Sequence, residues 1–136
     1  MKEPLLDTDT ISYFFKGDKN VIAKIDKYLL DFNFVNISVI TYYEVMNGLY
    51  YKDARKQLEK FKNFVERNNI IPMTSNSANI SAKITAELKK SGKFIGHNDI
   101  LIAGIAIEND CVLITNNSNH FSRINNLEID NWVIRK

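Results

Sequence analysis

The 136-residue sequence has little of what would indicate a disulfide-bonded, repetitive or membrane-spanning protein. It contains one cysteine, which excludes an internal disulfide, and it has no internal repeat, low-complexity segment or linker. No apolar run reaches the roughly 20 residues that cross a membrane, and residues 1–4 do not begin a signal peptide. A net charge of +2 is too small to indicate nucleic-acid binding by itself. We therefore expect a cytoplasmic protein that does not bind a membrane.

What the sequence does have is a regular alternation of strand and helix patterns. Strands are expected over residues 4–6, 34–39, 70–73 and 111–114, and a last one from residues 127–129 and 132–134. Helices are expected over residues 11–15, 19–31, 41–50, 54–67, 77–90 and 100–107, with a helical turn at 120–121. This alternation predicts one α/β domain over residues 1–136, a three-layer sandwich whose mainly parallel sheet of about five strands has helices on both faces. The third strand is expected at an edge, because Pro72 cannot donate to a neighbouring strand.

Residues 95–117 form the most informative segment of the chain. A polar turn at residues 96–99 precedes a helix that is apolar all round, and a buried strand at 111–114 ends at Asn116 and Asn117. In α/β proteins the N-termini of helices and the C-terminal ends of strands share one edge of the sheet, where ligands bind. Asp99 and the two asparagines are therefore expected at the same edge.

Three carboxylates, those of Asp7, Glu44 and Asp99, are expected at this edge, and each also has a purely structural interpretation. Asp7, or Asp9, could cap the first helix, and Asp99 could be a first-turn acid favoured by the helix dipole. Residues 41–44 match the Ser/Thr-x-x-Glu capping box, which would place Glu44 in the first turn of its helix.

Electrostatics favours a shared cation over three separate caps. Two carboxylates about 4 Å apart repel by roughly 4 kcal/mol at an effective dielectric constant of 20. A helix dipole recovers only about 0.3–1 kcal/mol for each acid. Oxygen ligands without a Cys or His pair at ligand spacing favour Mg²⁺, with Mn²⁺ as a substitute, over Zn²⁺.

The ordered motifs of the chain resemble those of PIN-domain ribonucleases, and most closely those of the VapC toxins of toxin–antitoxin pairs. The motifs are residues 5–9 (LLDTD), 43–48 (YEVMNG), 95–103 (IGHNDILIA) and 113–117 (LITNN), with residues 129–132 (IDNW) near the end. The resemblance implies a PIN-like fold and a Mg²⁺-dependent endoribonuclease with Asp7 and Asp99 as metal ligands and Glu44 as the third acid. It also implies an RNA substrate, with tRNA as one class, a cognate antitoxin and a homodimer.

The chain departs from this family at Asn117, where many relatives have a fourth acid. We therefore expect one metal ion, with Asn116 or Asn117 as a hydrogen-bonding or water-orienting group. Asp9 is expected to support the site or to cap the helix, His97 to be an exposed loop residue, and His120 to pack with Phe121 in the C-terminal turn. Abundant aromatic residues in the N-terminal half indicate an interface, unless all of them are buried in the core.

Two other functions fit parts of the sequence. The segment at residues 5–10 (LLDTDT) matches the opening motif of haloacid dehalogenase-like phosphatases, with Asp7 as nucleophile and Asp9 as acid and base. That mechanism needs a downstream lysine and an acidic pair, and residues 117–136 contain no two adjacent acids and only a terminal lysine. The other alternative is a catalytically silent PIN-like binding module, against which the presence of Asp7, Glu44 and Asp99 argues.

Overall fold

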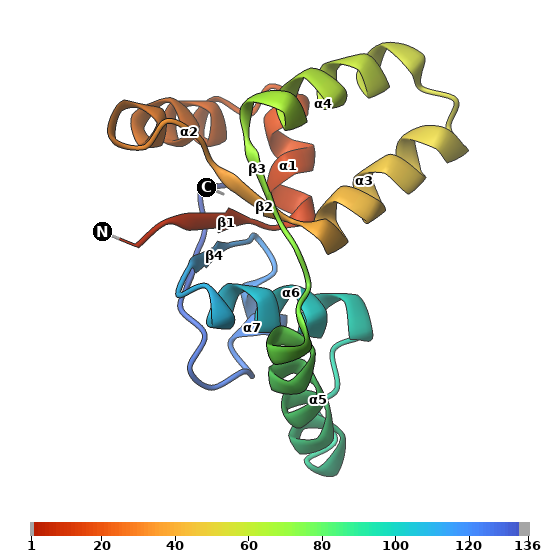
Figure 1. Ribbon diagram of the computed structural model, residues 1–136, viewed down its shortest axis with the longest axis vertical. Helices are drawn as coiled ribbons and strands as arrows, with labels where there is room; N and C mark the ends of the chain where they lie inside the picture. The colour runs from red at the N-terminus through yellow and green to blue at the C-terminus, as the bar shows by residue number, and fades with distance from the viewer. Residues whose placement is uncertain (1, 134–136) are drawn as a thin grey trace.

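The computed structural model describes residues 2–133 and shows an α/β sandwich (Figure 1). The strands are β1 (Pro4–Leu6), β2 (Asn36–Ser38), β3 (Asn69–Ile71), β4 (Val112–Ile114) and β5 (Ile129–Asp130). The helices are α1 (Thr8–Phe15), α2 (Lys19–Asp31), α3 (Val39–Tyr51), α4 (Arg55–Arg67), α5 (Ser75–Lys90), α6 (His97–Glu108) and α7 (Ser118–Phe121). None of the helices within residues 2–133 is long and apolar enough to span a membrane.

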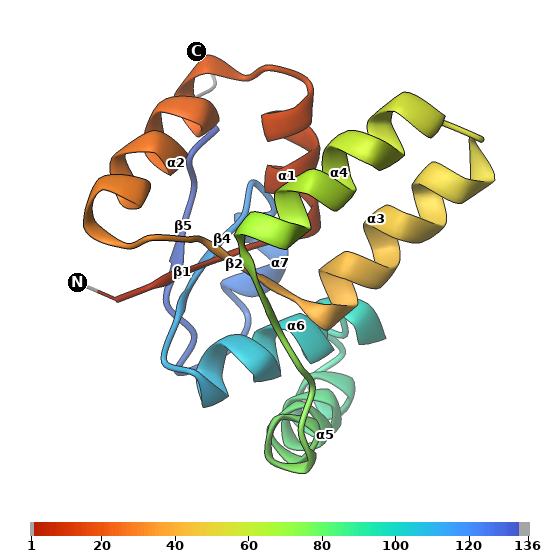
Figure 2. The same ribbon diagram turned by 45° about the horizontal axis from the view of Figure 1, so that its top comes forward.

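The five strands form one sheet in the order β3-β2-β1-β4-β5, and every pair is parallel. Helices α1 to α4 lie on one side of the sheet and α5, α6 and α7 on the other (Figures 1 and 2), which confirms the predicted sandwich. Strand β1 is central, with Leu6 level with Ile37 of β2 and with Ile114 of β4. The C-terminal ends of these three strands therefore meet at one edge of the sheet.

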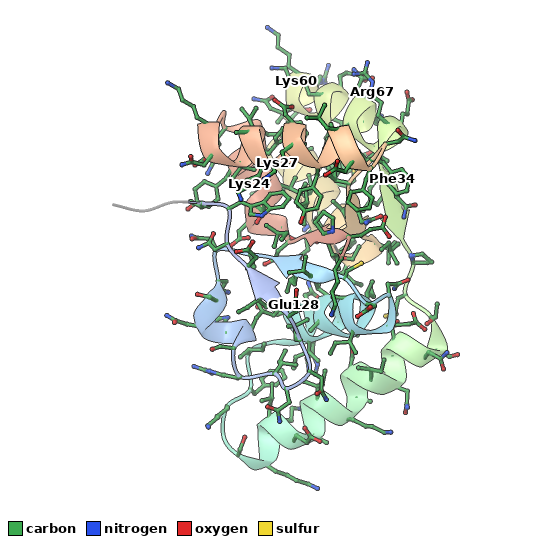
Figure 3. All side chains as sticks on the ribbon, turned by 90° about the vertical axis from the view of Figure 1, so that its left-hand side faces the viewer. Lys24, Lys27, Phe34, Lys60, Arg67 and Glu128 are labelled. Carbon is green, nitrogen blue, oxygen red and sulfur yellow. The ribbon has the colours of Figure 1, made fainter. Side chains whose placement is uncertain are left out.

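The core has two halves because both faces of the sheet are covered. Successive residues of a strand point to opposite faces, and Leu5 and Leu6 are both fully buried. Leu6 packs in the half that contains Phe61 and Phe64 of α4, whereas Leu5 packs in the half that contains the isoleucines of α6. Figure 3 shows charged side chains on the outer surface of the helical layer formed by α1 to α4, with Lys24 and Lys27 on α2 and Lys60 and Arg67 on α4.

Several element boundaries differ from the sequence-based predictions. Helix α3 begins at Val39, because the Ser38 side chain caps it by accepting from the Thr41 amide (3.0 Å). The predicted capping box at residues 41–44 is therefore wrong, and Glu44 lies in the second turn of α3. Strand β3 is an edge strand as predicted, but it ends at Ile71, before Pro72. Strand β5 spans only Ile129–Asp130, and residue 134 of the predicted last strand lies outside the described residues.

Helices α5 and α6 approach each other unusually closely on the second face of the sheet. Ser77 and Ser81 of α5 are buried, and the Ser81 hydroxyl donates to the Ile100 carbonyl of α6 (2.9 Å). Gly104 of α6 lies against these serines, and a Cβ atom at this position would collide with Ser81 Oγ and lie 2.7 Å from the Ser77 carbonyl oxygen. The contact that fixes α6 against α5 therefore requires a residue without a side chain.

Candidate active site

Asp7 lies where β1 ends and α1 begins, and its carboxylate is held on both oxygens. It caps α1 by accepting from the Thr8 amide (2.8 Å), and its other oxygen accepts from the buried Thr115 hydroxyl (2.8 Å). The residue is only 5% exposed. The capping interpretation of Asp7 is therefore correct, but a cap does not need this degree of burial or the second partner from beyond β4.

Asp9, in the first turn of α1, connects this helix to the segment that follows β4. Its carboxylate accepts from the Asn116 backbone amide (3.0 Å). The Asn116 side chain points elsewhere, since its Oδ1 accepts from Asn131 (3.0 Å) and its amide nitrogen lies 3.5 Å from the Tyr13 hydroxyl. Asp9 thus joins α1 to the segment after β4, and Asn116 contributes its backbone amide rather than its side-chain amide to this contact.

Glu44 reaches the same edge from the second turn of α3. The Thr8 hydroxyl donates to its carboxylate (2.7 Å) and lies 3.1 Å from the Thr41 hydroxyl. The Asn98 side-chain amide approaches the other Glu44 oxygen at 3.5 Å. Because Thr8 directly follows Asp7 in the sequence, its hydrogen bond to Glu44 fixes the position of Glu44 relative to Asp7.

Asp99 lies in the first turn of α6, and its carboxylate oxygen Oδ2 is 3.5 Å from Nδ1 of His120. The same imidazole nitrogen is 2.9 Å from the side-chain nitrogen of Asn117. Phe121 is fully buried, as predicted for the C-terminal turn. The His120 side chain, however, extends toward Asp99 instead of packing with Phe121.

These side chains surround one open pocket of about 410 Å³. Its lining consists of Asp7, Thr8, Asp9, Ser12, Tyr13, Lys16, Glu44, Asp99 and Asn117. The structure therefore brings together all four residues that the sequence indicated, namely Asp7, Glu44, Asp99 and Asn117. Thr8, Thr115, Lys16 and His120 were not predicted as site residues. Thr8 and Thr115 lie inside the motifs at residues 5–9 and 113–117, which could have indicated them, whereas Lys16 and His120 carry no such signal.

Three of the acids that line the pocket are harder to ionise than exposed ones. Burial, followed by the charge of Asp9 and more weakly that of Asp99, raises the pKa of Asp7 to about 7. Burial also raises the pKa of Asp9. Burial raises the pKa of Asp99 too, with a further contribution from Glu44, while the contact with His120 acts in the opposite direction. A cation in the pocket would offset the cost of ionising these buried acids.

The donor set suits a hard divalent cation that retains water ligands. Within residues 2–133, no group of three His, Cys, Asp or Glu side chains is placed to hold a metal ion together. Mg²⁺ is usually bound through one or two carboxylates and several waters, so two aspartates beside an open pocket are sufficient. Asp7 and Asp99 fit this description.

The raised pKa of Asp7 gives a prediction for the metal-free protein. Because the folded-state pKa of about 7 exceeds the ordinary 3.8, this group favours folding fully below pH 3.8 and loses that contribution as the pH rises to 7. Asp7→Asn does not titrate, so the stability of the variant relative to wild type should increase between pH 5 and 7, by up to about 1.4 kcal/mol per pH unit, and then level off. Thermal unfolding in EDTA from pH 5 to 8 measures this difference. A constant difference over that range would show that the Asp7 carboxyl titrates normally.

Comparison with known proteins supports the relationship that the motifs indicated. Residues 5–127 match the PIN domain family. The chain is 33% identical over 129 residues, 94% of its length and 96% of the relative's, to Ribonuclease VapC1 of Haemophilus influenzae strain R2866. It is 30% identical, with the same coverage, to the tRNA(fMet)-specific endonuclease VapC of Salmonella typhimurium. The structure superimposes with a TM-score of 0.86 and 30% identity on a chain of VapBC2 from Rickettsia felis bound to a DNA fragment from their promoter, covering 95% of this chain and 98% of that one.

Proposed function

This chain belongs to the PIN domain family and, within it, to the VapC ribonucleases, and from that premise we propose that it is a Mg²⁺-dependent endoribonuclease and the toxin of a toxin–antitoxin pair. The observation that carries the proposal is the pocket in which Asp7, Asp9, Glu44 and Asp99 converge. Burial first, and then the charge of Asp9, raises the pKa of Asp7, and a divalent cation would stabilise the ionised carboxylate against both. Mn²⁺ prefers similar oxygen ligands and should substitute for Mg²⁺.

Asp7 and Asp99 would hold the cation, and the remaining residues would position the reactants. When bound, Mg²⁺ supplies Lewis acidity toward a phosphoryl oxygen and lowers the pKa of water. Glu44, held by Thr8, faces the pocket as an acceptor for the proton of the attacking water. The Asn117 amide can orient that water, and Lys16 at the pocket wall can contact the RNA backbone without reading sequence.

The phosphatase alternative loses its basis with the family assignment. The silent binding module remains the relevant alternative, since it shares the fold. A silent module would not be expected to keep four acids around one pocket, which is a standing electrostatic cost without a cation.

The direct test is cleavage of RNA by the purified protein. We expect cleavage of single-stranded RNA or of tRNA in Mg²⁺ or Mn²⁺, and none in excess EDTA. We also expect Mg²⁺ to raise the melting temperature, because a ligand that binds only the folded state stabilises it. Cleavage that persists in EDTA would refute the metal-dependent mechanism, and the absence of both cleavage and a Mg²⁺-induced shift would favour the silent module.

A protein partner is the second part of the proposal. Not all the aromatic residues are in the core, because Tyr43, Tyr50 and Tyr51 of α3 are 61%, 61% and 89% exposed. A groove of about 420 Å³ also lies between α1, α3 and α4, with Phe15, Leu49 and Phe61 among its apolar lining. We propose that exposed α3 contributes to a homodimer and that the groove receives an apolar segment of the antitoxin.

Light scattering of the purified chain at micromolar concentration should give the mass of a dimer. Addition of the product of the adjacent small gene should produce a larger complex that does not cleave RNA. A monomer that also fails to bind that product would contradict this part of the proposal without affecting the proposed chemistry.

A further inference from the structure

His120 contacts the pocket residues without lining the pocket itself. Its Nδ1 atom lies 2.9 Å from the Asn117 side-chain nitrogen and 3.5 Å from Asp99 Oδ2, and both of those residues line the pocket. The His120 side chain is 42% exposed, so its position is not imposed by burial in the core. A partly exposed imidazole that turns toward two site residues, and does not line the pocket, can act on the site only through them.

The backbone around His120 is held in place by the burial of the next residue and by a backbone hydrogen bond. The following residue, Phe121, is fully buried, and the His120 amide donates to the Asn117 carbonyl (3.1 Å). The Asn117 backbone N–H in turn donates to the Thr115 hydroxyl (2.9 Å), and that hydroxyl donates to the Asp7 carboxylate (2.8 Å). His120 is thus part of a short connection that runs from Asp99 through residues 117 and 115 to Asp7.

Nδ1 of His120 faces both the Asn117 side-chain amide and the Asp99 carboxylate, and its protonation restricts the hydrogen bonds that these two groups can form. If Nδ1 carries a hydrogen, it donates toward Asp99 and requires the Asn117 amide to present its oxygen. If Nδ1 carries a lone pair, it accepts from the Asn117 NH₂ group, whose oxygen is then free to face the pocket. Each state therefore selects a single orientation of the Asn117 side-chain amide, and the state with the hydrogen on Nδ1 also holds Asp99 Oδ2.

We propose that His120 is a positioning residue, whose Nδ1 atom orients the Asn117 amide and the Asp99 carboxylate for a divalent cation and its water ligands. This inference rests on the proposed metal-dependent function. Partners that orient metal ligands from outside typically contribute 10–100-fold to metal affinity, although they never touch the ion. The site lacks a fourth acid at position 117, and His120 is what makes the neutral Asn117 a fixed group instead of a freely rotating one.

The test uses amide side chains that imitate one imidazole nitrogen at a time. His120→Asn places its amide near the position of Nδ1, whereas His120→Gln reaches the position of Nε2, and His120→Ala removes both. His97→Asn is the matched control, because His97 is exposed and its ring contacts Phe94 (5.0 Å between centroids). The measurements are Mg²⁺ affinity by calorimetry and the Mg²⁺-induced shift in melting temperature, with RNA cleavage followed in parallel.

We expect His120→Ala and His120→Gln to weaken Mg²⁺ binding by about 10–100-fold, and His120→Asn and the control to stay within a few-fold of wild type. If all variants bind Mg²⁺ like wild type, or if His120→Ala lowers only the metal-free melting temperature, the positioning role is refuted. Equal weakening in His120→Asn and His120→Ala would also refute it, since Nδ1 would then not be the relevant atom. A wild-type protein that binds no Mg²⁺ would instead refute the proposed function.

Discussion

Replacing Asp7 or Asp99 by asparagine should abolish RNA cleavage in Mg²⁺ while leaving the protein folded. Each change removes one of the two carboxylates that would hold the cation, and both residues line the pocket. Loss of a residue that merely supports a metal ligand costs about 10–100-fold, so loss of a ligand itself should cost more than about 100-fold. The rate of cleavage at saturating Mg²⁺, together with circular dichroism to verify the fold, measures the effect.

The matched control is Asp26→Asn, which removes one negative charge from the exposed surface of α2 and does not alter the pocket lining. It should cleave RNA at the wild-type rate, so any general effect of net charge on RNA binding is accounted for. Wild-type cleavage by either Asp7→Asn or Asp99→Asn would exclude that residue as a metal ligand. Asparagine keeps the shape of aspartate and can still accept from the Thr8 amide, so loss of folding is not expected to obscure the result.

Gly104→Ala should be among the most destabilising single substitutions in the chain, although it adds only one methyl group. The new Cβ would collide with Ser81 Oγ and would lie 2.7 Å from the Ser77 carbonyl oxygen, which belongs to the α5 backbone. A rotamer change can move a hydroxyl, but relief from the carbonyl requires the two helices to separate. Overpacking of this kind costs about 1–3 kcal/mol or more, and for a chain of this size about 3 kcal/mol lowers the melting temperature by roughly 10 °C.

Two further variants show whether the helix contact is the cause. Gly48→Ala makes the same change in α3 at a position where a Cβ meets nothing within 4 Å. It should be neutral or stabilise the protein by about 0.5–1 kcal/mol, because alanine favours helix more than glycine does. Ser81→Ala combined with Gly104→Ala should recover part of the loss and not all of it, since the Ser77 carbonyl remains. Equal melting temperatures for Gly104→Ala and wild type would contradict the close packing of α5 and α6.

The architecture and the main acids of the site could be predicted from the sequence because both depend on local patterns. Strand and helix periodicities are properties of neighbouring residues, and their alternation restricts the fold to a parallel sheet between helices. Asp7 follows β1, Asp99 lies in the first turn of α6 and Glu44 in the second turn of α3, so once the sheet is parallel its geometry brings them to one edge. The position of β3 at the edge followed in the same way from Pro72.

Local signals also compete, and the sequence does not say which one prevails. Ser38 and Thr41 are both good N-caps three residues apart, and the structure uses Ser38 as the cap of α3. Thr41 is thereby left within hydrogen-bonding distance of Thr8, and Glu44 moves from the first turn into the second. The choice depends on where β2 ends beside β1, which is a property of the sheet.

Only the tertiary structure decided the contacts between residues that are distant in the chain. His120 meets Asp99 because β4 pairs with β1 and returns the chain to the edge where α6 begins. Gly104 meets Ser77 and Ser81 because α5 and α6 cross at that point, and an isolated glycine in an apolar helix does not reveal what lies opposite. Periodicity determines which face of an element is buried, whereas the residues that meet that face are determined by how the elements pack. The proposed positioning role of His120 and the requirement for glycine at position 104 both depend on that packing.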